Sequence, residues 1–380
     1  MTSKILIVTT IAGTLEDFIL PFVHHYRHLG WQVDGVSVDI TSNQACVEAL
    51  NAVWDVPWSR NPLDPRNFIH AVPRIQEIVL QGNYDLVHVH TPVAAFVTRY
   101  AISQLKIKQK PQLIYTAHGF HFHQQGNPLT NFLFLNLERL AGRWTDYLIT
   151  INREDEAAGR KYQLLPEERI CYTPGIGLEI AKYDRHQVSP EQITEIRQEL
   201  HLMPEDVLLI TVAEFTPNKR HRDQLLALKE LNRSEVHLVL AGDGETRPEI
   251  EKLAQKLSLQ PQVHFLGFRY DIPALICAST ALLLTSQREG LPRSIMEAFC
   301  AGIPVIGTNI RGIQDLLADN CGLLVEVGDI KALSQAIAKM IDHPQLAKEM
   351  GANGRAKVAS YDVQNIIEQY TQIYCQALAR

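Results

Sequence analysis

The sequence lacks the features that mark several classes of protein. None of its six cysteines belongs to a C-x-x-C pair, which argues against a disulfide framework and a zinc ribbon and fits a reducing cytoplasm. Acidic residues, 42 in all, outnumber the 36 lysines and arginines, so no basic field favours nucleic acid. No segment approaches the roughly 20 apolar residues that cross a bilayer, and the amino terminus lacks a signal-peptide pattern. We therefore expect a cytoplasmic protein with no nucleic acid partner.

Two domains are predicted by the length and by the rhythm of apolar segments. At about 150 residues per domain, a chain of 380 residues suffices for two. Short aliphatic runs alternate with helix-length polar stretches, as in sheets of buried parallel strands. The runs span residues 4–10, 31–38, 84–89, 112–116 and 146–150, and then residues 207–213, 236–240, 263–266, 281–285, 303–306 and 322–325. The predicted fold class is α/β, with two doubly wound sheets.

Breaks in this rhythm set the expected domain boundaries. Pro174, Gly175 and Gly177 interrupt residues 172–184, where we place the hinge. The stretch 362–379 has apolar residues at helical spacing. We expect a first Rossmann-like domain over residues 1–185, a second over residues 186–358, and a carboxy-terminal helix over residues 359–380 that packs back on the first domain.

The most informative window is residues 286–308, which follow a predicted strand. Pro292 suits the first residue of a helix, which needs no N–H, and Gly302 suits the end of that helix. A strand, a tight loop and a short helix are therefore predicted. The free N–H groups around residues 290–294 and the positive end of the helix dipole would bind an anion such as phosphate.

Two glutamates, Glu289 and Glu297, bracket the start of this helix with seven residues between them. Carboxylates so placed can accept hydrogen bonds from hydroxyl groups on either side of a diphosphate, which is how a nucleotide sugar presents its sugar and its ribose. The spacing alone is explained equally well by two exposed surface acids.

This window resembles the Glu, seven residues, Glu signature of glycosyltransferase family 4, whose members are retaining enzymes of the GT-B fold. The similarity covers essentially the whole chain, and further matching segments stand in the family's order: residues 241–245, Gly267 with Phe268, and residues 301–308, 312–315 and 321–329. Residues 116–123 and 174–179 are similar to members that build capsular polysaccharide or exopolysaccharide. The resemblance implies a GT-B architecture, in which an amino-terminal acceptor domain and a carboxy-terminal nucleotide-sugar donor domain face each other across a cleft.

The resemblance also assigns roles at the donor site. Glu297 would hold the ribose hydroxyls, and Glu289 would reach the hydroxyls of the donor sugar. Lys219 would neutralise the diphosphate as charge builds on the leaving group. The catalytic candidates are His118, Lys219 and Glu289, and the other donor-binding candidates are Gly13, Thr14, Gly267, Phe268, Gly290 and Leu291, with the last two acting through their backbone amides.

The segment after the first strand, residues 10–18, contains Gly13 but no G-x-G-x-x-G motif. A dinucleotide-dependent oxidoreductase is therefore disfavoured. In the family this segment approaches the diphosphate and the acceptor, which gives Gly13 and Thr14 their expected role. A plain strand-to-helix turn explains the two residues equally well.

One position departs from the family pattern. Many members have an arginine five residues before the lysine, where this chain has Glu214. A carboxylate cannot clamp a phosphate, so either Arg220 or Arg222 supplies the second positive charge, or Glu214 serves another purpose, such as orienting Lys219. The alternative is a damaged donor site, as in a partner subunit without donor activity.

Histidines gather in the first half of the chain, where ten of the 15 precede residue 190. Alternate histidines on a strand, such as His88 and His90, point to one face and suggest a metal site. No acidic residue stands beside them at ligand spacing and the family mechanism is metal-independent, so we expect no metal or other cofactor. The resemblance places His118 beside the donor sugar. The candidates for contact with the acceptor are His90, His121 and His123.

We therefore expect a retaining hexosyltransferase that moves a sugar from a nucleoside diphosphate sugar, UDP-linked by family frequency, to a hydroxyl group. The acceptor would be a sugar or a lipid-linked glycan in the synthesis of exopolysaccharide, capsule or glycolipid. Residues 129–144, apolar with Arg139 and Arg143, suit a peripheral contact with the inner face of the membrane, and a plain buried helix explains them equally well. The alternative enzyme is a nucleotide-sugar 2-epimerase of the same fold, which would need no acceptor.

Overall fold

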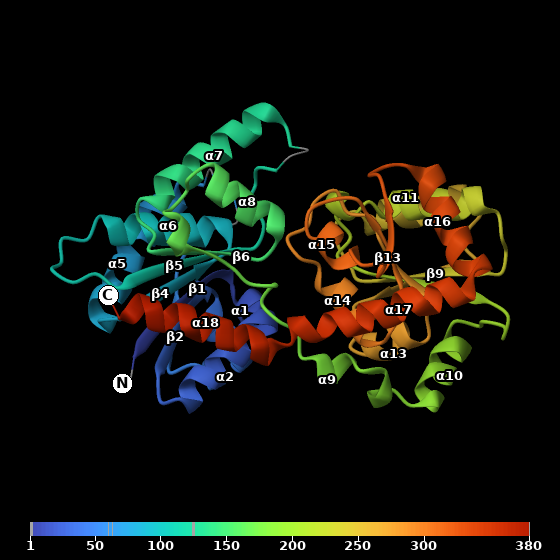
Figure 1. Ribbon diagram of the computed structural model, residues 1–380, viewed down its shortest axis with the longest axis horizontal. Helices are drawn as coiled ribbons and strands as arrows, with labels where there is room; N and C mark the ends of the chain where they lie inside the picture. The colour runs from blue at the N-terminus through green and yellow to red at the C-terminus, as the bar shows by residue number, and fades with distance from the viewer. Residues whose placement is uncertain (1–2, 60, 63, 124–125, 380) are drawn as a thin grey trace. The chain divides into compact units, whose positions relative to one another are not determined.

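The computed structural model describes residues 3–59, 61–62, 64–123 and 126–379. The chain divides into two compact units, one formed by residues 1–177 with residues 363–380, and the other by residues 178–362. We call them the first unit and the second unit, and Figure 1 labels many of the elements of each. No helix in the described part of the chain is both long and apolar enough to span a membrane.

The first unit is built on a seven-stranded parallel sheet with the order β3-β2-β1-β4-β5-β6-β7. Its strands are β1 (Lys4–Ile11), β2 (Gln32–Val38), β3 (Ala52–Asp55), β4 (Leu86–His90), β5 (Gln112–Ala117), β6 (Tyr147–Thr150) and β7 (Ile170–Tyr172). The order reverses between β1 and β4, and open α/β sheets bind ligands beyond the carboxyl ends of the strands at such a point. Strands β3 and β7 are missing from the sequence prediction, because β3 is only partly buried and ends in an aspartate, and β7 has three residues.

Helices cover both faces of this sheet because side chains alternate along its buried strands. Ile5 and Ile7 of β1 face α1, α2, α3 and α18, whereas Leu6 and Val8 face α5 and α6. The helices of the first unit are α1 (Ala12–Phe18), α2 (Leu20–His28), α3 (Gln44–Ala49), α4 (Arg66–Ile69), α5 (Ala71–Gly82), α6 (Pro92–Ser103), α7 (Pro128–Gly142), α8 (Arg153–Lys161) and α18 (Val363–Leu378).

The carboxy-terminal helix α18 is part of the core of the first unit. Its tyrosines are buried and reach polar groups of the sheet. The Tyr374 hydroxyl lies 2.5 Å from His88 Nδ1, and the Tyr370 hydroxyl lies 3.3 Å from Thr116 Oγ1. The sheet face that α18 covers is therefore completed by residues from the far end of the chain.

The second unit repeats the same arrangement with six parallel strands in the order β10-β9-β8-β11-β12-β13. Its strands are β8 (Val207–Val212), β9 (Val236–Ala241), β10 (Val263–Gly267), β11 (Ala281–Leu284), β12 (Val305–Thr308) and β13 (Gly322–Val325). Here the order reverses between β8 and β11. The loops that follow these two strands are therefore the expected place for a ligand in this unit.

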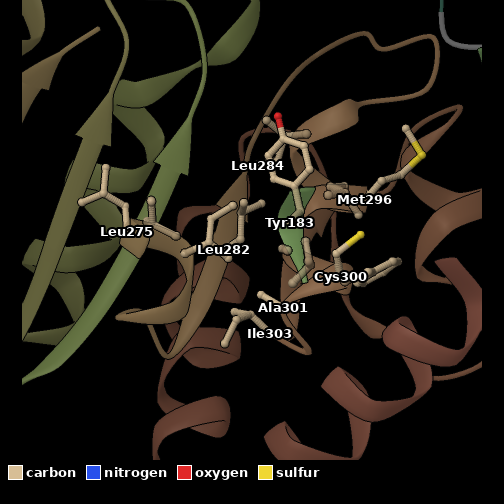
Figure 2. Packing of buried hydrophobic residues seen from close by; sticks show 14 of the residues in the cluster. Tyr183, Leu275, Leu282, Leu284, Met296, Cys300, Ala301 and Ile303 are labelled. Atoms are coloured by element: carbon tan, nitrogen blue, oxygen red, sulfur yellow. The ribbon is translucent and has the colours of Figure 1, made fainter. Parts of the chain in front are cut away.

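Helix α14 (Arg293–Cys300) is anchored in the core of the second unit. Figure 2 shows its Met296 and Cys300 among buried residues that include Tyr183 and, on β11, Leu282 and Leu284. The other helices are α9 (Ile180–Tyr183), α10 (Pro190–Glu199), α11 (His221–Leu231), α12 (Arg247–Lys256), α13 (Ile272–Cys277), α15 (Ile313–Leu317), α16 (Ile330–Asp342) and α17 (Pro344–Val358). Since residues 285–292 alone join β11 to α14, this packing holds the helix start close to the end of the strand.

Candidate functional site

Lys219 and Glu289 meet at the point where the strand order of the second unit reverses. Lys219 ends a short 3-10 helix (Pro217–Lys219) after β8, and Glu289 lies in the loop after β11. The Lys219 Nζ donates a hydrogen bond of 2.6 Å to Glu289 Oε1. Their side chains are 23% and 12% exposed, so the pair is partly shielded from water. Both expected catalytic groups of this unit thus lie within reach of one ligand.

Backbone contacts tie the two loops together. The Asn218 side chain donates to the Arg288 carbonyl at 3.0 Å, and the Gln287 N–H donates to the Asn218 carbonyl at 2.8 Å. These bonds fix the distance between the loop that carries Lys219 and the loop that carries Glu289.

A buried series of hydrogen-bonded side chains holds the backbone of Lys219. The Thr211 hydroxyl donates to Gln224 Oε1 at 2.9 Å, Gln224 Nε2 donates to the Thr285 hydroxyl at 2.9 Å, and that hydroxyl donates to the Lys219 carbonyl at 3.0 Å. All three supporting side chains are buried. The sequence analysis did not identify these three residues. Thr211 and Thr285 could have been recognised, because each is a polar residue in or next to an apolar strand.

Glu297 is buried in α14 rather than exposed on its surface. It is 7% exposed, and Arg293 Nε lies 3.0 Å from its Oε1. Burial raises the pKa of the Glu297 carboxyl, and Arg293 opposes that rise. The interpretation of Glu289 and Glu297 as solvated surface acids is therefore wrong. Burying a carboxylate is costly unless it is paired, and Arg293 supplies the partner here.

The start of α14 lies one residue later than the sequence predicts. Pro292 is the N-cap, with φ −74° and ψ 120°, and Arg293 is the first helical residue. Because the ring of proline fixes φ near this value, the residue fits the cap as well as the first turn. Gly302 has φ +70°, as expected of the glycine that ends a helix.

The loop before α14 is held by the segment after β12. Arg311 is buried, and its Nε donates to the Glu289 carbonyl at 3.1 Å. Gly312 has φ +76° and packs so closely that a Cβ there would come 2.1 Å from the Gly290 carbonyl oxygen. Gly290 and Leu291, the expected phosphate-binding residues, therefore lie in a backbone that packs tightly against this segment.

Gly267 and Phe268 lie at the end of edge strand β10. The Gly267 carbonyl accepts a hydrogen bond of 2.8 Å from the Gly242 N–H. The Phe268 ring is 78% exposed, so its face is open to stack on a planar group.

Of the two expected substitutes for the missing arginine, one is already engaged and the other is exposed. Glu214 is exposed. Arg220 makes two hydrogen bonds to Asp223, of 2.5 Å and 3.1 Å, and Arg222 is exposed on α11. Lys219 therefore carries the positive charge nearest to Glu289 in this loop.

In the first unit, Gly13 and Thr14 lie inside a helix. Strand β1 continues to Ile11 and runs directly into α1, which begins at Ala12. The alternative interpretation of these two residues as a turn between strand and helix is therefore wrong. A Cβ added at Gly13 would meet no other atom within 4 Å, so this helical position borders open space.

The buried histidines of β4 and the partly exposed His118 form a cluster in the first unit. The rings of His88 and His90 pack at a tilt with centres 4.1 Å apart, and His90 Nδ1 lies 3.0 Å from His118 Nε2. Burial lowers the pKa of His88 to about 3 and that of His118 to about 4, so both rings are neutral at pH 7. In the described part of the chain no three or more histidine, cysteine or acidic side chains are arranged so that they could hold a metal ion.

The remaining two histidines lie beside α7. His121 packs on Phe134 with ring centres 4.9 Å apart. His123 is held through its backbone, because its carbonyl accepts a hydrogen bond of 2.7 Å from Asn131. Both are partly exposed.

Comparison with known proteins identifies the family. Residues 13–175 match the glycosyl transferase 4-like domain, and residues 192–357 match the glycosyl transferases group 1. The putative glycosyltransferase EpsD of Bacillus subtilis is 30% identical over 379 residues, which are 98% of this chain and 97% of that relative. The chain belongs to glycosyltransferase family 4.

Other relatives are more distant in sequence, and solved structures share the fold. A UDP-Gal:α-D-GlcNAc-diphosphoundecaprenol α-1,3-galactosyltransferase of Escherichia coli is 25% identical over 79% of this chain and 77% of its own. HepE of Anabaena in complex with UDP and glucose has a TM-score of 0.82 at 22% identity, covering 98% of this chain and 100% of its own. Sucrose-phosphate synthase of Thermosynechococcus elongatus has a TM-score of 0.81 at 20% identity, covering 99% of each chain. The expected family and GT-B fold are confirmed.

Proposed function

We propose that this glycosyltransferase is a retaining hexosyltransferase that uses a UDP-sugar and a glycan acceptor in exopolysaccharide, capsule or glycolipid synthesis. The Lys219–Glu289 pair, beside the start of α14 where the sheet order reverses, carries the proposal. The names of relatives support it: the Escherichia coli relative takes UDP-galactose to a diphosphoundecaprenol-linked sugar, and Anabaena HepE is solved with UDP and glucose.

Each group in the second unit has a proposed partner in the donor. Buried Glu297 accepts hydrogen bonds from the ribose hydroxyls, and the amides of Gly290 and Leu291 bind the phosphates. Lys219 lies on the diphosphate and Glu289 on the sugar hydroxyls. These two roles agree with the 2.6 Å contact between them, since diphosphate and sugar are adjacent in the donor. Phe268 and Gly267 are proposed to meet the base. The roles expected of His118, Gly13 and Thr14 stay predictions for the first unit, as do the domain boundaries.

The proposed reaction needs no covalent enzyme intermediate. The bond from the anomeric carbon to the diphosphate oxygen breaks, and the acceptor oxygen bonds to the same face of that carbon. The acceptor proton passes to the departing phosphate oxygen. Lys219 and the amides before α14 stabilise the negative charge on that oxygen, so the proposal assigns this task to the protein rather than to a metal ion.

Product stereochemistry tests this reaction. An α-linked UDP-sugar is expected to give an α-linked product by proton NMR, with no glycosyl adduct on Glu289 in mass spectra of quenched enzyme. A β-linked product would mean inversion, and an adduct would mean a double displacement. Epimerisation of the donor sugar in the absence of an acceptor would favour the nucleotide-sugar 2-epimerase. Absence of UDP binding in calorimetry would favour the partner subunit without donor activity.

The acceptor is proposed to be lipid-linked and reached from the membrane surface, because α7 presents an apolar outer face. Only Ala141 and Gly142 of this helix are buried, so the interpretation as a plain buried helix is wrong. Leu129, Phe132 and Leu133 are 78%, 67% and 57% exposed. A soluble surface rarely gathers such side chains without a partner.

The charges of α7 favour an anionic lipid surface as that partner. Its acidic residue, Glu138, is turned inward onto the buried Arg99 guanidinium at 3.1 Å. Arg139 and Arg143 are exposed near its end. Apolar side chains beside unpaired basic groups are typical of helices that lie in the headgroup region.

Vesicle sedimentation tests this contact. The protein is expected to bind vesicles that contain phosphatidylglycerol and to stay in solution with pure phosphatidylcholine. Replacing Leu129 and Phe132 with serine should lower the bound fraction at least about tenfold, since each buried side chain contributes about 1.5–3 kcal/mol. Leu80→Ser, at a site 52% exposed on α5, is the matched control. If the native protein is instead a dimer and the α7 variant is a monomer, the partner of this face is a second copy of the chain.

A further inference from the structure

A partly buried contact between two histidines in the first unit determines where His118 carries its proton. We propose that His90 is a positioning residue that keeps His118 protonated on Nδ1, so that His118 offers an N–H donor and no basic nitrogen. What this means for sugar transfer rests on the proposed function, whereas the proton position itself does not.

The geometry leaves two arrangements of the proton. His90 Nδ1 and His118 Nε2 are 3.0 Å apart, so one of these nitrogens donates to the other. If His118 were the donor, His90 would accept on Nδ1 and carry its own proton on Nε2. If His90 is the donor, His118 accepts on Nε2 and carries its own proton on Nδ1.

The surroundings of His90 decide between the two. His90 is 1% exposed, and its Nε2 has no hydrogen-bond partner among the described residues. A proton on that atom would be a buried N–H without an acceptor, which folded proteins rarely contain. A bare lone pair there is the less costly choice. His90 therefore donates from Nδ1.

Neighbouring contacts keep the His90 ring in this position. His88 packs against the ring but has both nitrogens engaged, with Tyr374 and with Thr116 Oγ1 at 2.8 Å, so it does not compete for His118. Thr91, the next residue, has φ +61° and ψ 137°, an unfavourable conformation for a β-branched side chain. It is held there by the Thr10 N–H, which donates to the Thr91 hydroxyl at 2.9 Å. Such strain persists where the surrounding structure imposes it, often at functional sites.

The tautomer limits what His118 can do. Its Nε2 lone pair already accepts a hydrogen bond, and its Nδ1 carries a hydrogen. Burial also keeps the ring neutral, because the pKa of His118 is lowered to about 4 and that of His90 lies well below its ordinary value. His118 can therefore donate to a sugar or phosphate oxygen but cannot take a proton from the acceptor hydroxyl. An inverting reaction with His118 as its base is disfavoured on this ground.

Nitrogen NMR of the native protein tests the proton position directly. With histidine labelled by ¹⁵N, long-range ¹H–¹⁵N spectra at pH 7 distinguish protonated from bare ring nitrogens, and His118→Asn assigns the signals. We expect His118 to be protonated on Nδ1 and bare on Nε2. A protonated Nε2, or a doubly protonated ring, would overturn the proposal whether or not the protein transfers sugar.

Two variants of nearly equal shape test the role of His90. In His90→Asn the amide nitrogen is bonded to Cγ as Nδ1 is, so it can still donate to His118, whereas His90→Leu cannot. His90→Asn should keep the tautomer and most of the native kcat. His90→Leu should lose the tautomer signature and about 10- to 100-fold in kcat, as when a partner that orients a functional histidine is removed.

UDP affinity, measured by calorimetry, is the control for these variants because the proposed nucleotide contacts lie in the second unit. It should be equal in the native protein and both variants. Equal kcat in all three proteins, or equal loss in both variants, would overturn the positioning role. Absence of UDP binding in the native protein would count against the proposed function alone.

Discussion

Replacing Lys219 with alanine is expected to lower kcat about 100- to 1000-fold, because a group that stabilises charge on the leaving oxygen acts most strongly in the transition state. UDP binding should weaken less than turnover. The expected contrast is Glu297→Ala, which should weaken UDP binding by about 1–3 kcal/mol and leave folding intact, since it leaves the ribose hydroxyls without their acceptor. Initial rates and calorimetry with UDP measure both effects.

Because Lys219 is paired with Glu289, a second variant is needed to interpret the effect of Lys219→Ala. Lys219→Ala leaves the Glu289 carboxylate, which is 12% exposed, without its partner, and this charge would repel a diphosphate. The double variant Lys219→Ala/Glu289→Gln removes that repulsion. If it recovers most of the rate, Lys219 acts by neutralising Glu289 and not on the leaving group. Lys229→Ala, an exposed lysine on α11, should change neither rate nor affinity.

Glu138→Ala is expected to destabilise the first unit by about 3–5 kcal/mol, because it leaves a buried guanidinium without its counter-charge. Arg99 is 1% exposed, contacts Glu138 at 3.1 Å and lies over the Tyr115 ring at 4.1 Å. Urea unfolding followed by tryptophan fluorescence reports this unit selectively. All tryptophans of the chain lie in it, at Trp31, Trp54, Trp58 and Trp144.

Two control variants separate burial from charge. Glu77→Ala removes an ion pair with Arg74 in which both side chains are substantially exposed, and such pairs contribute at most about 1 kcal/mol. The double variant Arg99→Met/Glu138→Leu should recover most of the lost stability, since apolar pairs of similar volume often replace buried ion pairs without loss. A loss for Glu138→Ala no larger than that for Glu77→Ala would contradict the expectation.

The sequence predicts the strands that carry the site better than the contacts within it. Eleven of the strands follow from apolar runs, because buried parallel strands are continuously apolar. The approach of Lys219 to Glu289 does not follow, since 70 residues separate them. It depends on β8 and β11 being neighbours in the sheet, and the sequences of the two strands do not determine the order of strands.

Burial of polar side chains is the other property that the sequence conceals. Glu297 has the sequence character of a surface acid, and its burial results from the packing of α14 in the core of the second unit. His90 and His118 are 28 residues apart and meet because β4 and β5 pair side by side. In both cases the tertiary arrangement determines whether the side chain is buried. The residue type determines only the free-energy cost of that burial.

Helix α18 determines the order in which the two units can finish folding. Its side chains complete one core layer of the first unit, yet the ribosome synthesises them only after all of residues 178–362. The second unit is contiguous and can fold during translation as soon as it has emerged. The first unit, although its strands are synthesised earlier, has to wait with the apolar surfaces around Phe22 and Tyr26 uncovered. The half of the molecule that is translated first is therefore the half that finishes folding last, and during that interval it is the part most dependent on chaperones.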